Sequence, residues 1–167
     1  MALSLVAVLG ALGAGLAIVV STESAIAQHF YAARRLRYAS DAALELATQT
    51  LATAAEWDLV LRANRQAGDP RVALESPGGP WRLVLECRLS DVSGNGEDDG
   101  EVLAAWVADD SEDADGDEST DSNGRLLLRG LAVGLAGGRA WSAATVARDF
   151  RDGVPGPIRW LSWHVLE

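Results

Sequence analysis

The first twenty residues of the chain contain no charged side chain. From Ala2 to Val20 the run is almost wholly apolar, and Ser4 is its only polar residue. At about 1.5 Å per residue, a helix of this length spans the hydrocarbon core of a bilayer. A secretory signal peptide has a basic stretch before a shorter apolar core, and no Arg or Lys precedes this run. Residues 1–22 are therefore predicted to be a helix buried in lipid or in protein. Cleavage after Ala25-Ile26-Ala27 stays the alternative.

Small residues gather in the middle of this apolar run. Gly10 and Ala14 are four residues apart, as are Ala11 and Gly15, and Gly13 lies between them. Small residues at this spacing allow two membrane helices to approach closely. The alternative is that glycine is simply common in membrane-spanning helices. The functional interpretation is a packing face for copies of this chain or for related chains.

The helical pattern continues beyond the membrane-length segment. From Leu16 to Ala67 there is neither Gly nor Pro, and Ala, Leu, Glu, Gln and Arg are frequent. Apolar residues recur at spacings of three and four, for example at Leu44, Ala47 and Leu51. We therefore expect one continuous helix that ends near residue 66, before Gly68 and Pro70, with residues 23–67 as its amphipathic part.

After Gly68 the apolar period changes from helical spacing to two. The clearest strand is Trp81–Leu89, whose odd-numbered residues are apolar and are predicted to share one face. Turn signals, including Ala136-Gly137-Gly138 and Asp152–Pro157, separate the later candidates. Residues 68–167 are thus predicted to form an antiparallel sheet that packs on the amphipathic helix, an α+β fold. The strands expected after the first are Val102–Val107, Leu126–Val133, Ala140–Phe150 and Ile158–Leu166.

Negative charge is concentrated in one segment. The formal net charge is −10, and residues 97–121 hold twelve of the 24 Asp and Glu residues and no Arg. Alternating oxygen ligands in the loop 97–124 suit a hard cation such as calcium, although the spacing is not that of an EF-hand. The alternative is a solvated acidic loop that is kept open by self-repulsion. The candidate calcium ligands are Asp113, Asp115, Asp117 and Asp121.

Other functional classes find little support in the sequence. The sequence has no basic stripe of the kind that binds nucleic acid. It also has no phosphate loop, no dinucleotide-binding fingerprint and no His or Cys residues at the spacing of metal ligands. The two histidines, His29 and His164, have no obvious partners, and Cys87 fits a small buried core residue. Most of the six tryptophans fall in predicted strands, where core packing is the simpler interpretation and an aromatic binding face the alternative. We therefore expect a protein that is not an enzyme and has no cofactor other than calcium.

The order of these features resembles the type IV pilins, and in detail the PilX-type pilus-assembly proteins. The start Met1-Ala2-Leu3 resembles a mature pilin N-terminus, and Arg35–Ala47 is similar to the helix that follows the membrane segment in those proteins. The segments Asp121–Arg129 and Arg139–Arg148 are similar to their later hairpin. The chain departs from the major pilins at two positions.

Major pilins carry a glutamate at the fifth mature position and a proline near position 22, where this chain has Leu5 and Thr22 if Met1 is the mature start. PilX-type subunits and some tip pseudopilins also lack that glutamate. The resemblance implies a long N-terminal helix that packs in a filament through Leu5 and the small residues described above. It also implies other pilin subunits as partners, an inner-membrane location before assembly and an extracellular filament afterwards. A single-pass surface domain with a ligand-binding acidic loop and a type II secretion pseudopilin remain the alternatives.

Overall fold

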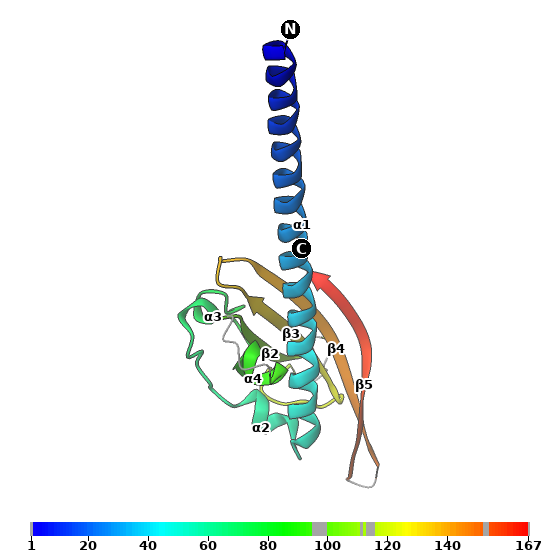
Figure 1. Ribbon diagram of the computed structural model, residues 1–167. Helices are drawn as coiled ribbons and strands as arrows, with labels where there is room; N and C mark the ends of the chain where they lie inside the picture. The colour runs from blue at the N-terminus through cyan, green and yellow to red at the C-terminus, as the bar shows by residue number, and fades with distance from the viewer. Residues whose placement is uncertain (1, 95–99, 111, 113–115, 152–153, 167) are drawn as a thin grey trace. The chain divides into compact units, whose positions relative to one another are not determined.

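The computed structural model describes all residues except 1, 95–99, 111, 113–115, 152–153 and 167, and only the backbone of 2–8, 150 and 151. The chain divides into two compact units, Met1–Arg35 and Leu36–Glu167. Helix α1 (Ala2–Thr53) is 52 residues long, begins in the first unit and ends in the second (Figure 1). Its length follows from the absence of Gly and Pro between Leu16 and Thr53 and from the many Ala and Leu residues.

A five-stranded antiparallel sheet forms most of the second unit, which confirms the predicted α+β fold. The strands lie in the sheet in chain order, so that each pairs with its neighbour in sequence. Short connections favour this order because consecutive antiparallel strands need only a tight turn between them. The strands are β1 (Arg82–Arg88), β2 (Val102–Asp109), β3 (Arg125–Val133), β4 (Arg139–Arg151) and β5 (Val154–Leu166).

Both faces of the sheet are covered near its middle. One face packs against the C-terminal half of α1, which in Figure 1 lies across β3 and β4, and Leu44, Leu51, Leu103 and Leu128 are fully buried there. The other face packs against the segment between α2 (Trp57–Leu61) and β1, which contains α3 (Pro70–Leu74). Because both faces are covered, β2 is buried along nearly its whole length.

A bulge in β1 changes which face its apolar residues occupy. The pairing with β2 shifts between Leu83 and Leu85. Leu83 packs on the α3 side of the sheet, whereas Val84, Leu85 and Cys87 pack on the α1 side. The prediction that the odd-numbered residues of Trp81–Leu89 share one face was therefore wrong, because the extra residue of a bulge reverses the alternation. A short helix, α4 (Leu89–Ser93), follows the strand directly.

Helix α1 ends at Thr53, earlier than the end near residue 66 that the sequence predicts. The chain then turns and forms the separate five-residue helix α2. Trp57 lies at the start of α2, and its indole nitrogen donates a hydrogen bond of 3.2 Å to the carbonyl of Leu51. The side chain that holds the end of α1 is that of Arg148 in β4.

The last two hairpins differ in how well their turns are predicted. Residues 134–138 form the expected turn between β3 and β4, where the amide of Gly134 donates to the carbonyl of Gly138 and Gly137 has a φ of 77°. Between β4 and β5 the expected turn at Asp152–Pro157 is shorter, because Val154 already pairs with Arg151 in the sheet. Residues 152 and 153 lie outside the described part of the chain.

Candidate functional site

The first candidate site is the apolar half of α1. Every side chain described from Leu9 to Arg35 is exposed, and the exposed fraction reaches 70% at Leu16. Within the described residues, α1 is the one helix long and apolar enough to span a membrane or to act as a signal sequence. Exposure of so much apolar surface indicates a surrounding of lipid or protein, because monomeric soluble proteins rarely expose large contiguous apolar patches.

The small residues predicted to pack helices together lie on this exposed segment. Gly10, Ala11, Gly13, Ala14 and Gly15 are all exposed, and a methyl group added at any of the three glycines would have no neighbour within 4 Å. No contact inside the chain therefore requires glycine at these positions. The side chain of Leu5 lies outside the described part of the chain.

The other half of α1 approaches the sheet very closely at Gly130 in β3. A Cβ atom built on Gly130 would lie 2.5 Å from the carbonyl oxygen of Ser40 and 2.9 Å from Cγ of Leu44. Both distances are far below van der Waals contact for such atoms. Only glycine at this position allows the helix backbone to rest directly on the strand, and the small residues Ala43 and Ala47 are also fully buried in this interface.

Polar side chains join α1 to β4 and β5 beside this close contact. The hydroxyl groups of Ser40 and Ser142 are 2.9 Å apart and fully buried, and Ser142 donates to the carboxylate of Asp41 at 2.6 Å. The indole nitrogen of Trp163 donates to the same carboxylate oxygen at 3.1 Å. One acidic residue of the helix therefore accepts hydrogen bonds from two different strands.

Arg148 of β4 holds the C-terminal end of α1. Its guanidinium group donates to the carbonyl oxygens of Ala54 at 2.7 Å and Ala55 at 3.3 Å, and it lies 4.4 Å from the ring centre of Trp57. A cation suits this position because the last carbonyls of a helix carry partial negative charge. Arg148 is almost fully buried, and desolvation lowers the pKa of its guanidinium group below the usual value.

The backbone of Arg148 also binds the end of the acidic segment. Its amide donates to the carbonyl of Gly124 at 2.8 Å, and Gly124 has a φ of 71°. A Cβ atom on Gly124 would lie 2.5 Å from the carbonyl oxygen of Arg148. Glycine is required there by both its backbone conformation and the close contact.

Two acidic residues of the loop 97–124, Asp117 and Asp121, accept hydrogen bonds within local turns. Asp117 accepts hydrogen bonds from the amide and hydroxyl of Ser119, and these bonds hold the pKa of its carboxyl group below the usual value. Asp121 accepts from the amides of Gly124 and Arg125, and its own amide donates to the carboxylate of Asp58 in α2. These bonds attach the end of the loop to α2.

The calcium site stays a prediction. Two of its four candidate ligands, Asp113 and Asp115, lie outside the described residues, and Asp117 and Asp121 bind different backbone groups. Among the residues that the structure describes, no group of three His, Cys, Asp or Glu residues is arranged to hold a metal ion.

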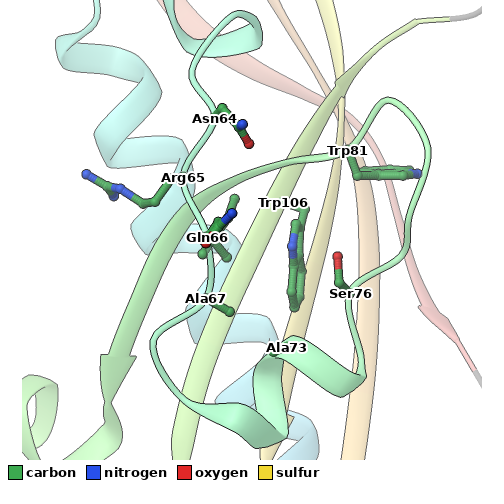
Figure 2. A pocket seen from close by; sticks show the side chains of 9 residues that line it. Asn64, Arg65, Gln66, Ala67, Ala73, Ser76, Trp81 and Trp106 are labelled. Atoms are coloured by element: carbon green, nitrogen blue, oxygen red, sulfur yellow. The ribbon is translucent and has the colours of Figure 1, made fainter.

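A cavity of about 360 Å³ lies on the face of the sheet opposite α1. Asn64, Gln66 and Ser76 contribute polar groups to its lining, and Trp81 and Trp106 contribute aromatic rings. In Figure 2, Trp106 lies between the loop that carries Asn64 to Ala67 and the segment that carries Ser76 and Trp81. The sequence pattern did not predict this cavity. Its one signal was the number of tryptophans, for which core packing was the simpler interpretation.

The tryptophans in fact have mixed environments. Trp57 and Trp106 are buried, as core packing predicts, whereas Trp163 is 40% exposed. Cys87 is half-buried against the core, and burial raises the pKa of its thiol group. His29 and His164 are both exposed.

Comparisons with known proteins add no relative to this description. No protein-family model matches the chain, and no curated protein or solved structure matches it either. The chain is therefore pilin-like in the arrangement of its elements alone, which is a long apolar N-terminal helix packed on a five-stranded antiparallel sheet.

Proposed function

We propose that this chain is a structural subunit of a type IV pilus or a related filament. The observation that carries the proposal is the division of α1 into two halves with opposite surroundings. Its residues from Leu36 onward are fixed to the sheet, whereas the residues from Leu9 to Arg35 expose apolar side chains. In a filament, the exposed half packs against the same segment of other pilin subunits, and before assembly it lies in the inner membrane.

The small residues of α1 supply the physical basis for assembly. Lipid tails are as apolar as leucine, so moving this helix from lipid into protein brings no hydrophobic gain. The gain comes instead from close packing of backbones, which Gly10, Ala11, Ala14 and Gly15 permit. The chain moves from the membrane into the filament only if neighbouring helices pack against this segment better than lipid does.

The second candidate function is a single-pass surface domain whose helix stays in lipid. The observation that favours it is the acidic segment, which carries half of the acidic residues and would face a ligand or cation outside the cell. Calcium bound by Asp113, Asp115, Asp117 and Asp121 belongs to this second proposal. A calorimetric titration of the full chain with calcium tests it, and no heat at millimolar calcium would end it.

The two functions differ in where the full-length protein is found. Filaments sheared from the cells that make the protein are separated from membranes, and the protein is quantified in both fractions. The test variant carries Gly10→Leu and Ala14→Leu, and a second carries Ala11→Leu and Gly15→Leu. The matched control carries Leu12→Ile and Leu16→Ile in the same segment. All three keep the helix apolar, so insertion into the membrane is retained.

We expect the wild type and the control in sheared filaments. At least one of the two leucine pairs should lower the filament fraction by about tenfold or more, which corresponds to roughly 1.4 kcal/mol of lost packing, with the membrane amount unchanged. Retention of the wild type in membranes alone, with none in filaments, would refute the filament proposal and favour the surface domain.

A further inference from the structure

The cavity on the α3 side of the sheet is held open by hydrogen bonds between the loop before α3 and β1, one of which comes from the lining residue Arg65. Arg65 donates from its guanidinium group to the carbonyl of Val84 in β1 at 3.0 Å. The amides of Gly68 and Asp69 donate to the carboxylate of Glu86 at 2.8 and 2.6 Å. These bonds attach the loop before α3 to the edge strand, so the cavity is formed before any ligand arrives.

The two tryptophans of the cavity are held in place by residues that do not line it. Trp106 is buried and lies 5.5 Å from the ring centre of Trp141. Trp81 is partly exposed, and the guanidinium group of Arg129 in β3 lies 4.5 Å from its ring centre. Arg129 does not line the cavity, so this cation–π contact holds the indole in place while the ring still lines the cavity.

Apart from Arg65, whose guanidinium group binds the carbonyl of Val84, the polar residues that line the cavity carry neutral groups that both donate and accept hydrogen bonds. The amides of Asn64 and Gln66 each carry two N–H donors and a carbonyl acceptor, and the hydroxyl of Ser76 does both. All three side chains belong to exposed residues, and Figure 2 shows Asn64 and Ser76 extending toward the space around Trp106. A purely apolar ligand would make no hydrogen bond with these groups.

We propose that this cavity binds a saccharide, with the pyranose ring against the indole of Trp81. A pyranose has an apolar C–H face that matches a flat indole ring, and hydroxyl groups that donate and accept at its edge. Asn64, Gln66 and Ser76 bind those hydroxyl groups. The volume of about 360 Å³ lies within the range of small-molecule sites.

The site binds the sugar and does not cleave it. Hydrolysis of a glycosidic bond uses a pair of carboxyl groups on either side of that bond. The described residues that line the cavity include no Asp or Glu. Saccharide binding in this cavity is independent of whether α1 assembles into a filament.

The experiment uses the full chain in micelles of dodecylphosphocholine, because a detergent with a sugar headgroup would compete for the cavity. Glucose, galactose, mannose and N-acetylglucosamine are titrated separately and followed by saturation-transfer NMR. Trp81→Ala removes the aromatic surface, and Trp163→Ala is the matched control, since Trp163 lies on the α1 side and donates to Asp41. Gln66→Ala removes a polar contact without touching the core.

At least one sugar should bind with a Kd of about 10 mM or tighter. Trp81→Ala should weaken that binding by at least tenfold, Gln66→Ala by several-fold, and Trp163→Ala by less than twofold. If Trp81→Ala does not fold, Gln66→Ala together with Asn64→Ala decides the question. Absence of a signal from all four sugars, or equal weakening by Trp81→Ala and Trp163→Ala, would overturn the proposal. Binding of free tryptophan but of no sugar would also overturn it and would assign the cavity to an aromatic side chain of a peptide.

Discussion

Replacing Gly130 with alanine is expected to separate α1 from the sheet by a distance that the structure allows us to estimate. The new methyl group would lie 2.5 Å from the carbonyl oxygen of Ser40 and 2.9 Å from Cγ of Leu44. Leu44 can rotate, but the carbonyl is part of the helix backbone. The helix therefore has to move by roughly 1 Å to reach ordinary van der Waals separation.

That movement also lengthens the hydrogen bonds beside the contact. Ser40 and Ser142 are 2.9 Å apart and fully buried, so a shift of about 1 Å breaks their bond. Overpacking a core costs about 1–3 kcal/mol, and a lost buried hydrogen bond adds about 1 kcal/mol. We expect Gly130→Ala to lower the free energy of unfolding by about 3 kcal/mol. At roughly 4 °C per kcal/mol this is a fall of about 12 °C in Tm.

The assay is urea unfolding of the full chain in detergent micelles, followed by tryptophan fluorescence and analysed by linear extrapolation. Gly134→Ala is the matched control, because it adds the same methyl group in the same hairpin but makes only ordinary contacts, with Leu36 at 3.4 Å and with the carbonyl oxygen of Gly138 at 3.7 Å. The control should change the free energy of unfolding by less than about 0.5 kcal/mol. Equal values for the two variants would show that α1 does not rest on β3 as closely as the 2.5 Å distance at Gly130 requires.

Three further predictions concern the groups that fix α1 and α3. Arg148→Met should cost about 3 kcal/mol in the same assay, because two carbonyls lose a charged donor, whereas Arg159→Met, which removes only an exposed ion pair with Asp149, should change little. The hydrogen bond from Arg71 holds the pKa of Asp69 below its usual value, so its contribution is complete above about pH 4 and is lost as the pH falls through the lowered pKa. The urea midpoint of the wild type should therefore fall further on acidification than that of Asp69→Asn. Ser142→Ala removes a buried donor to the helix carboxylate and should cost about 1–2 kcal/mol, measured as a lower thermal midpoint.

The parts of the fold that can be predicted from the sequence are those that depend on local patterns. Four of the five strands begin and end within about two residues of their predicted limits, and β5 begins four residues earlier than predicted, because alternating apolar residues and the Gly137 turn are local signals. The exposed apolar half of α1 is predictable for the same reason, since it depends only on composition.

The end of α1 could not be predicted in this way. Its sequence continues with good helix formers through residue 67, and nothing local stops the helix at Thr53. The end is held by Arg148, which is 94 residues away from Ala54 in the chain. The cavity beside Trp106 could not be predicted for a similar reason, since its lining comes from α3, from the segments before and after it, from β1 and from β2. Tertiary contacts of this kind override local propensity and leave no periodic trace.

The two halves of α1 have opposite structural properties, and this bears on the proposed assembly of the chain into a filament. The sheet-bound half is fixed by glycine and buried hydroxyl groups whose positions tolerate little movement. The apolar half has three glycines within six residues and no contact inside the chain that requires them. Each glycine weakens a helix by about 1 kcal/mol relative to alanine, so this segment is where the helix can most easily stretch. A rigid attachment at one end and a deformable segment at the other would let the apolar half adapt to its neighbours without disturbing the sheet.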